Sequence, residues 1–228
     1  MSSRRILAID LSGRSGGAAL LEQEADGEPR TIAEHEGSVR GEQMVRLFAW
    51  IDRLLQDAGW SRNALDGFVA THGPGSFTGI RVALGTLRGL SLATGRPAVG
   101  VTTLEAVAEA HGPDAAGRIP LIGAGRGEVY GAWYDGPSSP PVELSAPRVG
   151  RLAALLQDAG GMLVLCTSEL QSAVEARGLR WAPSPTGIAA AAGRIALRSG
   201  RLDDPGAAPP LSPLYLRPPD ATPGRRGA

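Results

Sequence analysis

Lysine is absent from this chain of 228 residues, and all 23 basic side chains are arginine. Without lysine, a Schiff base, a catalytic lysine amine and the lysine of a phosphate-binding P-loop are all excluded. The chain is rich in Ala, Gly, Pro and Arg, and this composition favours codon usage in a GC-rich genome as the reason why lysine is absent. Any anion site must therefore use arginine or backbone amides.

Cysteine, net charge and long apolar runs are also scarce. The single cysteine, Cys166, excludes an internal disulfide and a cysteine-based metal site, and its setting in "MLVLCTS" predicts a buried strand thiol. The 23 acidic residues balance the basic ones, which argues against a large nucleic-acid surface. No apolar run approaches the ~20 residues of a membrane span, and "MSSRRILAID" has no signal-peptide core. We expect a cytoplasmic protein with no membrane partner.

The first 102 residues predict one α/β lobe. The runs "RRILAID", "GGAALLEQ" and "RTIAEHEG" indicate a three-stranded antiparallel meander with Asp26–Gly27 as a hairpin turn. Apolar spacing and turn residues then predict a helix over 42–58, a strand over 65–71, a helix over 76–95 and a strand over 97–101. This order of elements is typical of a ribonuclease-H-like lobe.

A second, smaller lobe is expected over 103–217, with its last helix packing back on the first lobe. Its predicted elements are a hairpin over 118–135 with Gly125 and Gly127 at the turn, a helix over 148–160, a strand over 162–168 and helices over 169–178 and 186–200. Residues 218–228 are rich in proline and glycine, which predicts a disordered tail.

The loop "THGPGSFTGIR", residues 71–81, is the main candidate for chemistry. Its spacing does not fit a Walker A loop, and Ser76 lacks the flanking glycines of a nucleophile elbow. Ser76 is predicted to cap the following helix through the amide of Thr78 or Gly79. His72 is predicted to be a loop or strand-end histidine.

Two interpretations of this loop remain open. A strand, a Gly-Pro-Gly turn and a helix N-terminus can hold an anion weakly, whereas glycines can also serve only a tight turn. Asp10, at the end of the first strand, occupies the place where sugar kinases and actin-like ATPases face Mg²⁺ and nucleotide phosphates; it can equally close a strand turn. The candidate phosphate-lining residues are Asp10, Ser12, Gly73, Gly75, Ser76 and Thr78.

Four segments carry a resemblance to a known family. The run "GPGSFTGIRVALGTLRGLSLATGRPAVGVTTLEAVA" at 73–108, "ILAIDLS" near the start, "RGEVY" at 126–130 and "PLYLRPPDA" at 213–221 resemble the TsaB (YeaZ) family. The resemblance spans nearly the whole chain. It implies an actin-like ATPase (ASKHA) fold of two lobes, each a mixed sheet flanked by helices.

The resemblance also implies a role. In that family the chain is a non-catalytic partner of TsaD, which transfers threonylcarbamoyl to N6 of adenosine 37 in tRNAs reading codons that begin with A. TsaE is a further implied partner in the assembled complex, with tRNA contacted mainly through the complex. The resemblance implies no cofactor that this chain itself requires. It leaves open whether ATP or ADP binds where this chain meets its partner.

This chain lacks the metal-binding histidines of the catalytic paralogue, and it departs from the usual TsaB sequence in one hairpin. The His-x-x-x-His metal pair of the catalytic paralogue is missing, because the matching helix offers Gln43 and Leu47, so no metal site is expected. Many members of the family have Asp-Ala-Arg-Arg before Gly-Glu-Val-Tyr. This chain has Gly123 and Gly125 in place of the acid and the first arginine, so the roles of those residues do not transfer.

A partner surface is predicted on two helices. The apolar face of the helix after the loop is expected to hold Phe77, Ile80, Leu84, Leu87 and Leu90, beside a narrower face of small residues. The predicted interface, for TsaD or for a homodimer, comprises Val45, Ala49, Trp50, Thr78, Val82, Gly85, Gly89 and Ala93. The same faces could instead pack within one chain.

Three functional hypotheses follow. The first is the non-catalytic assembly subunit. The second is an actin-like ATPase or sugar-kinase-type enzyme that uses Asp10 and the Gly73–Gly79 loop with Mg²⁺ and a nucleotide. The third, ranked below both, is a hydrolase that uses Ser76 and His72.

Overall fold

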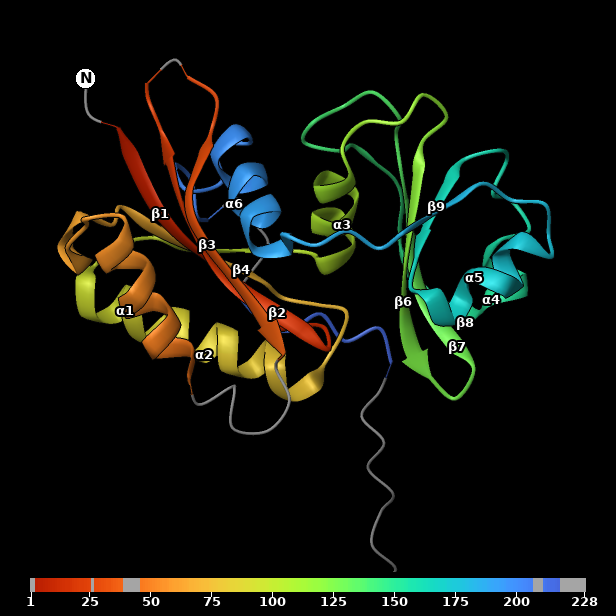
Figure 1. Cartoon of the computed structure of the whole chain (residues 1–228), viewed down its shortest axis with the longest axis horizontal. Coiled ribbons are helices and arrows are strands. Elements are labelled where there is room, and N and C mark those ends of the chain that lie inside the picture. The colour runs from red at the N-terminus through yellow and green to blue at the C-terminus, as the bar shows by residue number, and fades with distance from the viewer. Residues whose placement is uncertain (1–2, 26, 39–45, 207–210, 218–228) are drawn as a thin grey trace, which may run out of the picture.

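The computed structural model describes residues 3–25, 27–38, 46–206 and 211–217, which form two lobes side by side (Figure 1). Each lobe is built on a five-stranded mixed sheet. Asp26, Val45 and the 218–228 tail, all named above, lie outside the described residues. Within the described residues no helix is long and apolar enough to cross a membrane.

The first sheet has the order β3-β2-β1-β4-β5. Its strands are β1 Arg4–Asp10, β2 Ser15–Gln23, β3 Arg30–Ser38, β4 Gly67–Thr71 and β5 Ala98–Val101. β1 to β3 pair antiparallel as the predicted meander, and β4 and β5 run parallel to β1. This arrangement confirms the predicted ribonuclease-H-like fold.

One face of this sheet is covered by α1 Leu47–Asp57 and α2 Phe77–Thr94. A short 3-10 helix, η2 Arg62–Ala64, precedes β4. α2 ends as predicted at Gly95, whose φ of 67° is a left-handed conformation that glycine adopts without a Cβ penalty. The predicted apolar face of α2 is wrong at Phe77, whose side chain is 47% exposed, and the side chain of Phe48 in α1 is 58% exposed. Both aromatics point away from the core that the helices share.

The other face of the first sheet is covered by α6 Ile188–Arg198, the last helix of the described chain. Its alanines, with Ile195, pack on Ile6 and Ala8 of β1. A Cβ at Gly193 would meet a Leu21 methyl group at 2.5 Å, so the small side chains let this helix lie close to the sheet. A segment from the end of the chain thus completes the core of the first lobe.

The second sheet has the order β10-β9-β6-β7-β8. Its strands are β6 Arg118–Gly125, β7 Glu128–Tyr134, β8 Glu143–Arg151, β9 Leu163–Cys166 and β10 Trp181–Pro183. α3 Thr103–His111 packs on one face, and α4 Leu152–Leu155 and α5 Ser168–Glu175 pack on the other. Cys166 is buried in β9, as predicted.

The helix predicted over 148–160 is wrong. Residues up to Arg151 belong to β8, where Val149 pairs with Tyr130 of β7, and only four residues are helical. The sequence between Pro147 and Gly161 has helical apolar spacing, but pairing with β7 satisfies the backbone of its first part instead. α3, β8 and β10 were not predicted.

The two lobes are tied together by ion pairs between α3 and the α6 region. Glu109 of α3 is nearly fully buried and binds Arg198 at 2.7 Å, and Glu105 binds Arg201 at 2.6 Å. The segment 211–217 adds a second tie. Its Leu214 amide donates to the carbonyl of His72, and Arg217 donates to the carbonyl of Ala124 in β6.

Candidate functional site

A cleft of about 830 Å³ lies between the lobes, at the end of β1. The first lobe lines it with Asp10, Ser12, Arg14, Glu36, Gly75 and Ser76, and the second lobe with Thr103, Gly123, Gly125, Ser168 and Glu169. Arg14 and Glu169 form an exposed ion pair of 2.8 Å between the lobes at this cleft. Hydroxyl groups and carboxylates therefore dominate its polar lining.

Asp10 is buried at the base of this cleft. One carboxylate oxygen accepts hydrogen bonds from the Ser12 amide at 3.1 Å, the Ser12 hydroxyl at 2.6 Å and the Thr71 hydroxyl at 2.5 Å. Burial raises the pKa of the Asp10 carboxyl, and these three hydrogen bonds act in the opposite direction. Asp10 therefore fixes the β1–β2 turn, which is the role of an aspartate that closes a strand turn.

The glycine loop is packed tightly against this turn. Ser76 caps α2 as predicted, its hydroxyl accepting from the Gly79 amide at 3.2 Å, and its own amide donates to the Ser12 carbonyl at 2.7 Å. A Cβ at Gly75 or Gly79 would overlap the carbonyl of Ser12 or Leu11. Close backbone approach thus accounts for both glycines, and two amides that could hold a phosphate already have partners.

Four of the six predicted phosphate-lining residues meet in the cleft: Asp10, Ser12, Gly75 and Ser76. The other two do not line it. Gly73 is buried against Leu214, whose carbonyl a Cβ would meet at 3.0 Å, and Thr78 lies on the exposed side of α2. Only Gly75 and Ser76 of the loop reach the cleft, since Gly73 precedes them against the segment 211–217 and Thr78 already belongs to α2.

His72 and Ser76 do not form a catalytic pair within the described residues. His72 is buried, and its Nδ1 contacts the Ser212 carbonyl at 3.0 Å. Burial lowers the pKa of the His72 imidazole, while Nε2 has no partner among the described atoms. His72 is the strand-end histidine that was predicted, and it holds the segment 211–217 in place.

Sequence reasoning missed the contribution of the second lobe to the cleft. Thr103 begins α3 and is 4% exposed, yet its hydroxyl has no partner among the described atoms. The N-terminus of α5 contributes Ser168 and Glu169. Only the threonine pair Thr102–Thr103 signalled a helix start, through the capping preference of Thr102. In the described part of the chain, no cluster of three or more His, Cys, Asp or Glu residues could hold a metal.

The predicted interface residues divide into exposed and half-buried groups. Thr78, Gly85, Gly89 and Ala93 of α2, and Ala49 of α1, are exposed. Apart from the backbone of α2 itself, no described atom lies within 4 Å of a Cβ built on Gly85 or on Gly89, so no described residue covers this strip of α2. Val82 and Trp50 are half-buried, and Trp50 packs on the His35 ring with 4.6 Å between centroids.

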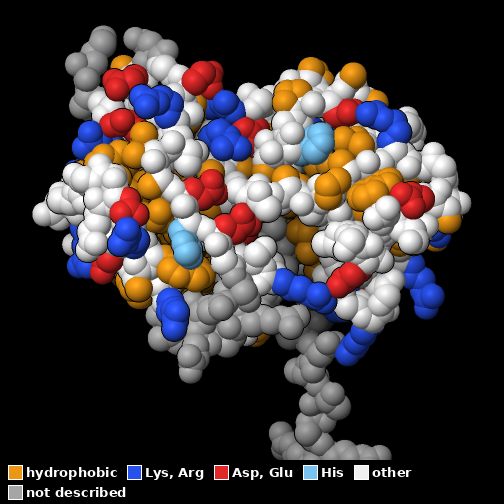
Figure 2. All heavy atoms as spheres, in the orientation of Figure 1, with side chains coloured by type: hydrophobic (Ala, Val, Ile, Leu, Met, Phe, Trp, Pro, Cys, Tyr) orange, Lys and Arg blue, Asp and Glu red, His pale blue; other side chains and the backbone are white. Residues whose placement is uncertain are grey.

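Charge does not mark a surface for nucleic acid on the face shown in Figure 2, where acidic and basic side chains are interspersed. Apolar exposure is more distinctive. Phe48 of α1 is 58% exposed and Leu92 of α2 is 87% exposed, and Leu92 lies two helical turns from Gly85. The α1–α2 outer face is defined here by the exposed residues Phe48, Ala49, Gly85, Gly89, Leu92 and Ala93. These residues are small or apolar, and exposed Arg88 lies on the same side of α2 between Gly85 and Leu92.

Comparisons with known proteins agree with this fold. A family model described as TsaD, tRNA N6-adenosine threonylcarbamoyltransferase, matches residues 41–138. The chain is 35% identical to the tRNA threonylcarbamoyladenosine biosynthesis protein TsaB of Escherichia coli, over 57% of this chain and 54% of that protein. It thus spans about half the length of the curated TsaB relatives that it matches.

Two further matches cover more of the chain. An uncharacterized protein of Mycobacterium tuberculosis is 32% identical over 84% of this chain and 87% of its own length. The solved structure of YeaZ from Pseudomonas aeruginosa is 26% identical with a TM-score of 0.71, over 95% of this chain and 100% of that one. With a YeaZ structure that matches both lobes and TsaB relatives at 32–35% identity, this chain belongs to the TsaB (YeaZ) family.

Proposed function

We propose that this chain is a non-catalytic subunit that binds and organises a TsaD-type transferase, for threonylcarbamoyl transfer to N6 of adenosine 37 in tRNAs reading codons that begin with A. Family membership supports the pathway, since relatives are named for tRNA threonylcarbamoyladenosine biosynthesis. Within the complex the transferase supplies the chemistry. A TsaE-type protein is a further partner, and tRNA is contacted mainly through the assembly.

The observation that carries this proposal is the open strip on α2. Gly85 and Gly89 face outward with nothing near a built Cβ, although glycine inside an exposed helix costs up to about 1 kcal/mol relative to alanine. A glycine that weakens the helix and packs on no described residue has a use when another backbone approaches it. Exposed Leu92 on the same helix and exposed Phe48 on α1 supply apolar area that such a contact would bury.

The test is light scattering on size-exclusion chromatography of the chain alone and mixed with the transferase of the same organism, with and without Mg-ATP. Gly85→Leu and Gly89→Leu should abolish the mixed complex and leave a folded monomer, because the added side chain has free space in the monomer only. Ser172→Leu, an exposed helical position on α5, is the matched control and should bind normally. A mixed complex that survives both glycine replacements would reject this surface, and a homodimer lost in the same variants would assign it to self-pairing.

A second candidate is Mg²⁺-dependent nucleotide binding in the cleft, either by this chain or at the partner boundary with ATP or ADP. The Thr103 hydroxyl lines the same cleft as Asp10 and has no partner among the described atoms, which favours a ligand there. The use of the Ser76 and Gly79 amides inside the protein weighs against a phosphate cradle at the loop. Calorimetric titration of the isolated chain with Mg-ATP decides: binding that is lost in Asp10→Ala supports this candidate, and no heat of binding removes it for the chain alone.

A further inference from the structure

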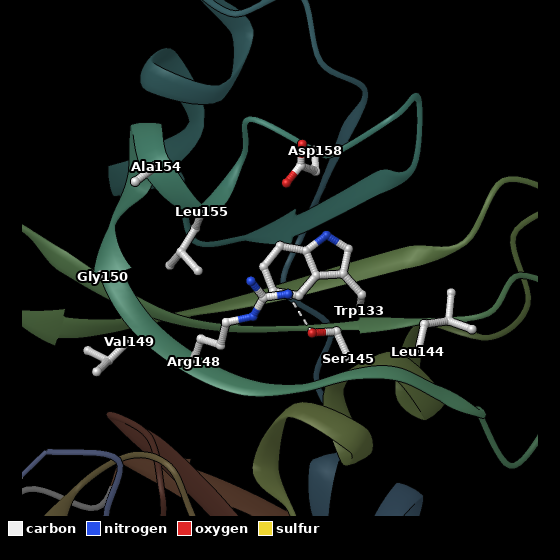
Figure 3. A pocket seen from close by; sticks show the side chains of 9 residues that line it. All are labelled: Trp133, Leu144, Ser145, Arg148, Val149, Gly150, Ala154, Leu155 and Asp158. Carbon is white, nitrogen blue, oxygen red and sulfur yellow. Dashed lines mark hydrogen bonds between the residues drawn. The ribbon is translucent and has the colours of Figure 1, made fainter.

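A second hollow lies on the second lobe, where the helical cover of the sheet is incomplete. Because α4 has only four residues, the sheet surface near β8 is left open above Trp133 of β7. The resulting pocket has a volume of about 390 Å³, and its lining includes Trp133, Leu144, Arg148, Leu155 and Asp158 (Figure 3). This volume is at the small end of the roughly 300–1,000 Å³ range of ligand pockets.

Two opposite charges face this pocket without an ion-pair partner among the described residues. The Arg148 guanidinium lies over the Trp133 ring at 4.6 Å and donates one hydrogen bond, to the Ser145 hydroxyl at 2.6 Å. Its remaining donors are unused within the described chain. Asp158 lies at the opposite rim in Figure 3 and likewise has no recorded basic partner among described residues. The pocket therefore offers one cationic and one anionic group.

The floor adds a polar group of its own. Trp133 is 7% exposed, and no described atom accepts a hydrogen bond from its indole nitrogen, which lies on the side of the ring toward Asp158 in Figure 3. This nitrogen is not among the fully buried polar atoms without a partner, so its N–H is open to the pocket and available to a ligand. Leu144 and Leu155 supply apolar walls on either side of the ring (Figure 3).

We propose that this pocket binds a free α-amino acid with an aliphatic side chain. The ligand carboxylate accepts from Arg148, the ammonium group donates to Asp158, and the side chain packs on Leu155, which lies on the same side of the Trp133 ring as the guanidinium (Figure 3). A simple anion would meet the charge of Asp158, and a simple cation would meet that of Arg148, so a zwitterion fits the lining best. The pocket shares no residue with the α1–α2 outer face, so ligand binding here is independent of the proposed function.

The probe is L-leucine, titrated into the full chain by calorimetry. Two analogues each lack one charged group: 4-methylpentanoate has no ammonium group, and 3-methylbutylamine has no carboxylate. Saturable leucine binding is expected, with each analogue at least about tenfold weaker, because each loses one charge-assisted contact. Arg148→Gln and Asp158→Asn should each weaken leucine binding by a similar factor. Both positions are exposed, so the fold is retained. Arg177→Gln, in the turn after α5 and outside the pocket lining, is the control and should bind as the parent does.

Three outcomes would overturn the inference. Absence of saturable binding up to about 50 mM leucine would show that Arg148 and Asp158 are solvated surface charges that bind no amino acid. Equal binding of leucine and either analogue would show that the matching charged group is not used. Leucine binding that is unchanged in Arg148→Gln and Asp158→Asn would place the ligand elsewhere on the chain.

Discussion

The two sheets have the same number of strands but different covers. Helices of 11 and 18 residues cover one face of the first sheet, and α6 with 11 residues covers the other, so the free surface of this lobe is the outside of its helices. The second sheet has α3 on one face and only the short α4 and α5 on the other, which leaves part of the sheet itself open. The same sheet size therefore provides a helical docking face in one lobe and a pocket in the other.

The lobes also differ in the polar groups that they bury. The first lobe buries Asp10, held by hydroxyl groups in the β1–β2 turn. The second lobe buries the guanidinium of Arg118, which donates to the carbonyls of Ala108, Gly112, Asp135 and Ser138 and so closes the C-terminal end of α3. The Asp10 carboxylate therefore holds the β1–β2 turn at the cleft, whereas the Arg118 guanidinium holds the C-terminal end of α3, the helix whose first residue lines the cleft.

The largest expected effect is on the second lobe, from Arg118→Ala. Removal of this fully buried side chain leaves at least four carbonyl groups without their donor, which should cost about 3–5 kcal/mol in the free energy of unfolding measured with urea. Arg53→Ala, which removes an exposed ion pair with Asp57, should cost at most about 0.5 kcal/mol. Equal costs for the two variants would contradict the role given to Arg118.

A smaller effect is expected within α2, where two glycines have opposite surroundings. Gly79→Ala places a methyl group against the Leu11 carbonyl and should destabilise the chain by about 1–3 kcal/mol. Gly85→Ala meets nothing and should stabilise it by up to about 1 kcal/mol through helix propensity. Thermal unfolding followed by circular dichroism compares the two. The comparison fails if both substitutions shift the midpoint in the same direction.

The smallest effect concerns pH. Because burial raises the pKa of Asp10 in the folded chain, the contribution of this carboxyl to stability is present below its unfolded pKa and is lost as pH rises through the folded value. Asp10→Asn cannot ionise, so its free energy of unfolding relative to the parent should increase from about pH 4 to about pH 7. A difference that stays constant over this range would show that the hydrogen bonds from Ser12 and Thr71 offset the burial completely.

Local sequence signals gave much of the first lobe correctly. The meander, α2 with its Ser76 cap and the stop at Gly95 were all predicted, because each depends on contacts within a few residues or on one apolar stripe. The predictions failed where two patterns compete. Residues 148–160 carry helical spacing, yet pairing of β8 with β7 decides the structure, and β7 lies outside any local window.

The candidate sites show the same division. From the glycine spacing alone, the loop could bind phosphate or could simply form a tight turn. The positions of the Ser12 and Leu11 carbonyls show why Gly75 and Gly79 tolerate no side chain. Phe77 was assigned to the core on spacing, but it stacks on Tyr215 of the C-terminal segment with Arg81 over its ring. No periodicity could place a partner 138 positions further along the chain.

The sequence by itself determined the fold family, the absence of lysine chemistry and the strip of small residues on α2, since composition and helical periodicity are properties of the chain alone. Tertiary structure decided which apolar residues are exposed, which amides of the glycine loop are already used, and that Trp133, Arg148 and Asp158 share one pocket. Burial and pairing depend on which distant segments meet, and that is fixed only when the two sheets and their helices pack together.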